Sequence, residues 1–98
     1  MIRQAPLTAE MIANGLKCHP RECVVALTYN AVAPLGVTVS IGIHEATFFW
    51  TVPKPATIRA PLSRHTKQIA SDFDKGRTIE PQTLEIDVPD ELYMESRS

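Results

Sequence analysis

The alternation of apolar and polar residues over Val37–Val52 is the clearest structural signal in the chain. Up to Ile43 the odd-numbered positions are apolar, and from Ala46 onward the even-numbered positions are apolar. Successive side chains of a strand point to opposite faces, so one straight strand would turn half of these residues to solvent. The change of phase therefore predicts a β-hairpin with His44-Glu45 as its two-residue loop.

In this hairpin the apolar residues pair on one face, as Ile43 with Ala46, Ile41 with Phe48, Val39 with Trp50 and Val37 with Val52. Phe49 then lies on the opposite face, and it is exposed if helices cover only the face that carries Trp50. His-Glu is a poor sequence for a tight hairpin turn, because such turns favour residues that tolerate a positive φ. A β-bulge near Gly42–Glu45 inside one long strand is the alternative.

The rest of the chain is divided by eight prolines, which interrupt both helices and central strands. Helical spacing of apolar residues predicts a first helix over Leu7–Lys17, capped by Thr8, which Asn14-Gly15 weakens and could end early. A short apolar, β-branched run predicts a buried strand over Glu22–Tyr29.

Pro53–Pro61 is interpreted as an extended connector. A second helix is predicted over Leu62–Lys75, with Ser63 as its cap and Gly76 at its end. Strict alternation predicts a strand over Thr83–Val88. We expect residues 89–98 to form a flexible tail with at most one helical turn.

Together these elements predict an α+β fold with the order α-β-β-β-α-β, in which both helices cover one face of an antiparallel sheet. A chain of 98 residues has room for a single domain, so residues 1–98 are assigned to one. Its 44% apolar and 21% charged residues are typical of a soluble globular protein.

Charge and targeting signals narrow the class of protein. A formal net charge of −1 gives no overall attraction to nucleic acid or to an anionic membrane. The N-terminal residues lack the apolar region of a signal peptide, and no apolar run is long enough to span a membrane. We therefore expect a cytoplasmic protein whose two cysteines are reduced thiols.

Candidate chemistry is sparse. Cys18, His19 and Cys23 are of the residue types that bind zinc, but their spacing does not match a zinc site, so metal binding is the third-ranked hypothesis. Adjacent residues such as Cys18 and His19 rarely form a catalytic pair, because a nucleophile and its base must meet within hydrogen-bond reach. The chain also lacks the common catalytic and phosphate-binding motifs, and we expect neither enzymatic activity nor a cofactor.

The charged residues are divided between two segments. Residues 54–67 carry bases without acids, and residues 80–95 carry acids without bases. The basic segment suggests the second-ranked hypothesis, a nucleic-acid-binding accessory protein, with a patch formed by Arg59, Arg64, Lys67 and Trp50.

The leading hypothesis is a small non-catalytic protein that binds another protein, as an accessory factor, regulator or inhibitor. Short chains of this kind are common in bacteria and their mobile elements. The expected contact surfaces are the sheet face around Phe49, the hairpin tip at His44 and Glu45, and the acidic strand at Glu85 and Asp87. A homodimer formed through the same sheet face is the alternative assembly.

Overall fold

The computed structural model describes residues 2–52 and 54–93, and it confirms an α+β fold. The elements follow in the order β1 (Ile2–Leu7), α1 (Ala9–Asn14), α2 (Val24–Val32), β2 (Thr38–Ile41), β3 (Glu45–Trp50), β4 (Ala56–Pro61), α3 (Arg64–Asp74), β5 (Gln82–Asp87) and a 3-10 helix, η1 (Asp90–Tyr93). Part of the predicted flexible tail, residues 94–98, lies outside the described residues. No helix among the described residues is long and apolar enough to cross a membrane.

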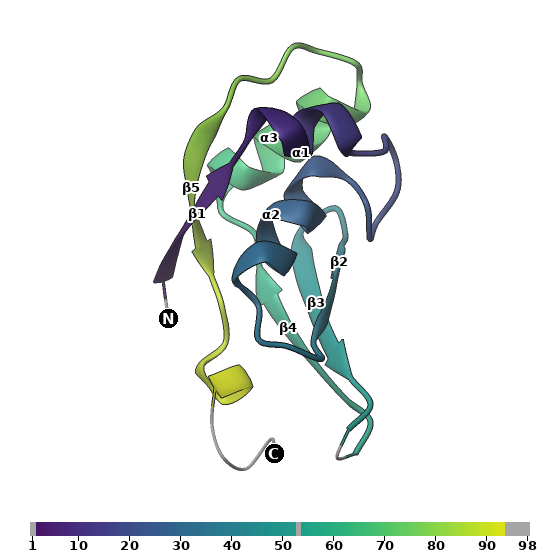
Figure 1. The fold of residues 1–98 in the computed structure, drawn as a ribbon, viewed down its shortest axis with the longest axis vertical. Helices are drawn as coiled ribbons and strands as arrows, with labels where there is room; N and C mark the ends of the chain where they lie inside the picture. Colours follow the sequence, from purple (N-terminus) through teal and green to yellow (C-terminus); the bar gives the residue numbers. More distant parts are fainter. Residues whose placement is uncertain (1, 53, 94–98) are drawn as a thin grey trace.

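The strands form two antiparallel sheets rather than the single sheet that was predicted. β1 pairs with β5, and β2, β3 and β4 form a separate sheet in that order. Figure 1 shows the β1–β5 pair standing beside the three-stranded sheet, with α1, α2 and α3 packed around the upper part of the molecule.

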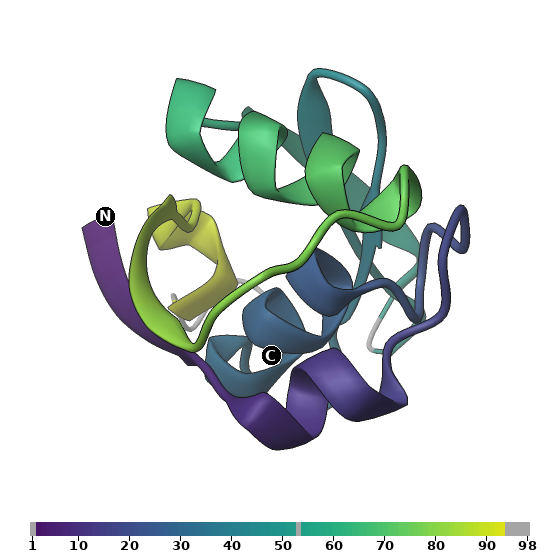
Figure 2. The ribbon, with the colours of Figure 1, turned by 90° about the horizontal axis from the view of Figure 1, so that it is seen from above.

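Helix α2 occupies the middle of the fold, where the sequence predicted a strand. It contacts both β1 and β2, and Figure 2 shows it between α1 on one side and α3 on the other. Its buried residues cover most of its circumference (Val24, Val25, Ala26, Thr28 and Tyr29). The prediction over Glu22–Tyr29 was wrong because the run of buried residues from Cys23 to Ala26 is continuous and has no periodicity that separates a helix from a strand.

The predicted hairpin is confirmed, but its register is displaced by two residues. Ile41 is opposite Ala46 and Val39 is opposite Phe48. A displacement of two positions keeps every side chain on its face, so the apolar set facing the core is as predicted (Val37, Val39, Ile41, Ala46, Phe48 and Trp50). The turn correspondingly moves from His44-Glu45 to Ile43-His44, and Ile43 and Val52 are exposed and fall outside the core.

Two strands were missed. The predicted connector contains β4, which pairs with β3 and has prolines at or near both ends. The first residues of the chain form β1, which includes Pro6 and is paired on one side among the described residues. Proline fits such edge strands because it lacks the N–H group that a central strand must donate.

The second predicted helix and the last predicted strand are confirmed. The Ser63 hydroxyl caps α3 by accepting from the Thr66 N–H at 3.1 Å, and Gly76 follows the helix with φ +77°. Thr66, Ile69 and Phe73 are buried on one side of this helix, as the spacing predicted. The Thr8 cap is also confirmed, but α1 ends at Asn14, in front of Gly15.

Candidate binding cleft

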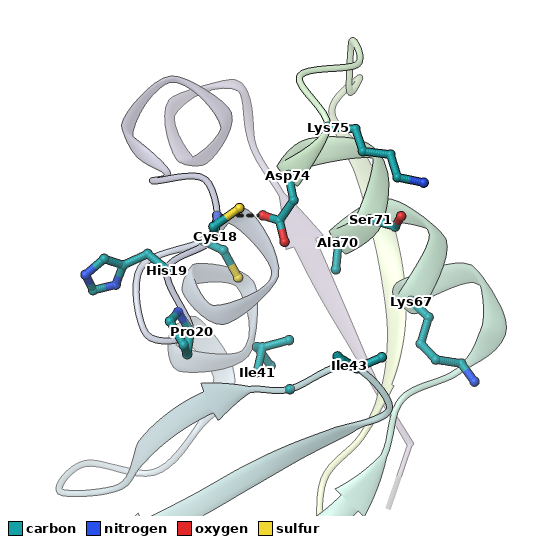
Figure 3. Close-up of a pocket in the computed structure, with 12 residues that line it drawn as sticks. Cys18, His19, Pro20, Ile41, Ile43, Lys67, Ala70, Ser71, Asp74 and Lys75 are labelled. Atoms are coloured by element: carbon teal, nitrogen blue, oxygen red, sulfur yellow. Dashed lines mark hydrogen bonds between the residues drawn. The ribbon is translucent and has the colours of Figure 1, made fainter.

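A cleft of about 610 Å³ opens beside the tip of the β2–β3 hairpin. One wall is the loop that leads into α2, the opposite wall is α3, and the hairpin tip forms the floor (Figure 3). The lining is more apolar than polar and consists of Cys18, His19, Pro20, Cys23, Ile41, Gly42, Ile43, Lys67, Ala70, Ser71, Asp74 and Lys75. Its size is in the range of protein clefts that hold small molecules.

Backbone hydrogen bonds hold the wall formed by residues 18–23 in place. The Cys18 N–H donates to Asp74 Oδ1 of α3 at 2.8 Å, and the Ile41 N–H of β2 donates to the Pro20 carbonyl at 2.8 Å. Cys18 has φ +57°, which is uncommon for a residue with a side chain. The loop is therefore attached both to α3 and to the hairpin, and the cleft between them is preformed.

The floor is formed by the hairpin tip, where Ile43 is 84% exposed. The Gly42 N–H donates to the Glu45 carbonyl at 2.8 Å, and this hydrogen bond closes the turn around Ile43 and His44. The His44 carbonyl accepts from the Leu62 N–H at 2.9 Å, so the tip is also tied to the segment after β4. The hydrogen-bonded turn thus holds the large apolar side chain of Ile43 in solvent.

The outer edge of the cleft is a ridge of α3 that carries Lys67, Ser71 and Lys75. Figure 3 shows both lysine side chains extending outward from the helix, whereas Asp74 points toward Cys18. Neither lysine forms an ion pair within residues 2–52 and 54–93. We refer to Lys67, Ser71 and Lys75 as the lysine ridge.

The two cysteines of the cleft differ in environment. Cys18 is exposed, whereas Cys23 is buried and its Sγ accepts from the Ala26 N–H at 3.5 Å, at the start of α2. Burial raises the pKa of the Cys23 thiol above its usual value, and the nearby Asp74 carboxylate raises it further. Cys23 is therefore a poor nucleophile and acts as a helix cap.

The structure does not bring the predicted metal ligands into one site. Figure 3 shows the His19 ring turned away from Cys18, and its Nε2 lies 3.7 Å from Glu22 Oε2. Among the described residues, no three His, Cys, Asp or Glu side chains are grouped closely enough to hold a metal ion.

The predicted sheet-face residue, Phe49, is half-buried rather than open. The Arg21 guanidinium lies over its ring, 4.8 Å from the ring centre. Such a cation–π contact covers part of the aromatic surface. Of the predicted tip residues, His44 is exposed beside Ile43, and Glu45 is half-buried, with Oε1 3.7 Å from Arg59 Nε.

The predicted acidic residues lie elsewhere. Glu85 and Asp87 line a second cleft of about 630 Å³ between the outer face of the β1–β5 pair and the start of α3. Glu85 Oε1 accepts from Gln4 Nε2 at 3.1 Å, and Asp87 is half-buried. His65 also lines this cleft, and its Nε2 is 2.7 Å from Gln82 Oε1.

The predicted nucleic-acid patch does not include an accessible tryptophan near its cations. Arg64 and Lys67 lie on α3, and Arg59 is on β4 opposite Thr47. Trp50 is 9% exposed and pairs with Ala56 at the far end of β3. At about 3.4 Å per residue, it lies roughly 17 Å along that strand from Glu45 and the hairpin tip.

Sequence reasoning missed Ile43, which it assigned to the core, and it missed Asp74 and Lys75. No turn residue marked Ile43-His44 in the sequence, since Gly42 in front of it is not among the glycines with positive φ. No signal could have joined Cys18 to Asp74, because they are 56 positions apart in the chain.

No protein-family model matches this chain, and comparisons with curated proteins and with solved structures found no match. The function must therefore be argued from the site itself.

Proposed function

We propose that this chain is a non-catalytic, cytoplasmic binding protein that takes an apolar side chain of a partner protein into the cleft beside Ile43. The observation that carries the proposal is the exposure of Ile43 on the floor of a preformed and mostly apolar cleft. At the core of a protein–protein interface, apolar side chains of one partner fill pockets of the other, and water is excluded from the contact. In this role the chain would be an accessory factor, a regulator or an inhibitor of that partner protein.

The support around the tip favours a binding role for Ile43. Backbone hydrogen bonds from Gly42 and Leu62 fix the turn, so little backbone freedom would be lost when a partner binds Ile43. Ordering flexible groups is one of the main costs of association, and a fixed turn avoids much of it. His44, which the sequence predicted as a contact residue, lies next to Ile43 and belongs to the same surface.

A non-catalytic role is supported by the state of the polar groups in the cleft. Cys23 serves as a helix cap, and the Asp74 carboxylate accepts the Cys18 N–H, so both are engaged in holding the walls together. His19 points away from the exposed Cys18 thiol (Figure 3). A nucleophile and base within hydrogen-bond reach would be needed for covalent catalysis.

The test is affinity capture from cells that encode the protein, with the bound proteins quantified by mass spectrometry. Full burial of an isoleucine side chain contributes about 1.5–3 kcal/mol, so Ile43→Asp is expected to reduce capture of the partner at least about tenfold. Val52→Asp is the matched control, because Val52 is also exposed, at 76%, but does not line the cleft.

The proposal is contradicted if Ile43→Asp and Val52→Asp both reduce capture of the same proteins. It is also contradicted if neither variant reduces capture. Phe49→Ala in the same assay tests the sheet face, which the account expects to contribute less than the tip. Sedimentation velocity of the purified protein tests the alternative of a homodimer.

A further inference from the structure

The charge around the cleft identifies the kind of segment that would occupy it. The two lysines that line the cleft have no ion-pair partner in the described part of the chain. Among the described residues the lining holds one acid, Asp74, which points toward Cys18 at the opposite wall, where its Oδ1 accepts the Cys18 N–H. The two lysines outnumber this acid, so the lining has a net positive charge at its outer edge, although the whole chain carries a formal net charge of −1.

The positions of these lysines give the cleft a direction. Lys67 and Ser71 on α3 and Lys75 at its C-cap are spaced by four residues, so they follow one line on the helix surface. The apolar part of the cleft, with Ile41, Ile43 and Ala70, lies on the inner side of this line. A segment that leaves the cleft on this side would pass over the lysine ridge.

We propose that the occupant is a partner segment with an apolar anchor flanked by carboxylates. The apolar side chain enters the cleft beside Ile43, and the flanking aspartate or glutamate side chains meet Lys67 and Lys75. The Ser71 hydroxyl lies between the two lysines and is available to a carboxylate or a backbone carbonyl. This inference rests on the docking function proposed above and names the chemistry of its partner.

The arrangement favours an acidic peptide over a nucleic acid. Phosphate recognition draws on many cations along a groove, with aromatic rings for the bases. Here two lysines flank an aliphatic surface, Trp50 is nearly buried, and the Phe49 ring is covered by Arg21. An aliphatic floor suits a leucine or phenylalanine side chain better than a base.

The experiment uses three fluorescein-labelled hexapeptides with the same central Leu-Phe pair. The flanking positions are all glutamate, all glutamine or all lysine, and binding to the full chain is followed by fluorescence anisotropy. We expect the glutamate peptide to bind most tightly and the lysine peptide least. Its advantage over the glutamine peptide should shrink between 20 and 300 mM salt, which shortens the Debye length from roughly 20 Å to about 6 Å.

Variants of the protein locate the effect. Lys67→Glu combined with Lys75→Glu is expected to weaken binding of the glutamate peptide by roughly tenfold, since a surface ion pair is worth up to about fivefold and charge reversal adds repulsion. Lys54→Glu is the net-charge control for Lys67→Glu alone, because the two single variants change the net charge equally and Lys54 lies in the β3–β4 loop, outside the cleft. It should change the affinity less than twofold.

Each other outcome overturns a stated part of the account. Equal binding of the glutamate and glutamine peptides, lost in both cases with Ile43→Asp, would overturn the acidic partner and leave the docking function standing. Binding of no peptide, or binding that Ile43→Asp does not change, would overturn both. Tighter binding of a labelled single-stranded oligonucleotide than of the glutamate peptide would make the occupant a nucleic acid and overturn this inference.

Discussion

The two ends of the three-stranded sheet both expose a large apolar side chain, but their surroundings differ. Ile43 at the β2–β3 tip lies on the floor of a cleft whose edge carries two lysines. At the other end Val52 is 76% exposed and Leu35 is 98% exposed, and neither lines either of the two clefts.

The difference shows that exposure alone does not define a binding site. Single apolar side chains on a protein surface are common and need no explanation. What distinguishes the tip is the combination of a fixed turn, an adjacent hollow and two lysines at its edge that form no ion pair with the described residues. We expect the two ends to differ in binding while they resemble one another in stability.

The largest effect is expected from the residue that supports the middle of the sheet between the two ends. Phe48 is fully buried, and its ring lies 5.9 Å from the ring of Tyr29 on α2. Phe48→Ala should lower the free energy of unfolding by about 3–5 kcal/mol, because it removes apolar contacts and leaves a cavity. Urea denaturation measures this, and a loss below 1 kcal/mol would mean that the sheet does not pack on α2 as described.

A change of pH acts on the same contact without a substitution. Burial raises the pKa of Tyr29 to about 12, and the Asp87 charge adds to the shift. A tyrosine in the unfolded chain titrates near 10, so the folded state keeps the proton more strongly. The stabilisation is complete below pH 10 and declines as the pH rises toward 12.

Over that range Tyr29 should account for a loss on the order of 2 kcal/mol. The measurement is the free energy of unfolding from pH 8 to 12, with Tyr29→Phe as the reference that removes the titrating group. Parallel curves for the two proteins would show that Tyr29 is not buried against the sheet.

Two glycines with positive φ provide a matched pair, one at each end. Gly36 has φ +87° and precedes β2, and Gly76 has φ +77° and follows α3 beside the cleft. Alanine is strained in this conformation, so Gly36→Ala and Gly76→Ala should each cost about 1 kcal/mol in thermal unfolding.

Their effects on peptide binding should differ. A Cβ at residue 76 would lie 3.1 Å from Lys17 Nζ and displace that flexible side chain near the lysine ridge, whereas a Cβ at residue 36 meets nothing within 4 Å. Gly76→Ala is therefore expected to change the affinity for the glutamate hexapeptide by up to about twofold, consistent with one exposed charge. A larger effect on affinity from Gly36→Ala than from Gly76→Ala would mean that the peptide binds near Gly36, at the end of the sheet away from the cleft.

The smallest effect on stability is expected from the two exposed side chains themselves. Ile43→Asp and Val52→Asp should each change the free energy of unfolding by no more than about 0.5 kcal/mol, as is usual for surface positions. Chemical denaturation measures both. A loss above 1.5 kcal/mol for Ile43→Asp alone would mean that Ile43 supports the fold and is not reserved for a partner.

The sequence predicted α3 almost completely, because one apolar face, a serine cap and a terminal glycine all specify the same element. It failed for α2, since the consecutive residues Val24, Val25 and Ala26 are all fully buried and carry no periodic signal. This segment forms a helix in the context of the whole fold, where it lies at the centre, and the local sequence does not specify that position.

The candidate site was only partly predictable for a related reason. Alternation established which face of the hairpin is buried, but a two-residue error in register assigned Ile43 to the core. The cleft also needs Cys18 and α3 to meet, and that contact depends on the complete fold. The sequence therefore indicated the hairpin tip as a contact surface without showing the hollow next to it.

Chemical-shift mapping tests the central claim most directly. The ¹⁵N-labelled protein is titrated with the glutamate hexapeptide, and the shifts are compared between the two ends of the sheet. The account predicts the largest changes at Ile43, Cys18 and the lysine ridge, with none at Leu35 or Val52. Changes confined to Leu35 and Val52, or to Glu85 and Asp87, would contradict it.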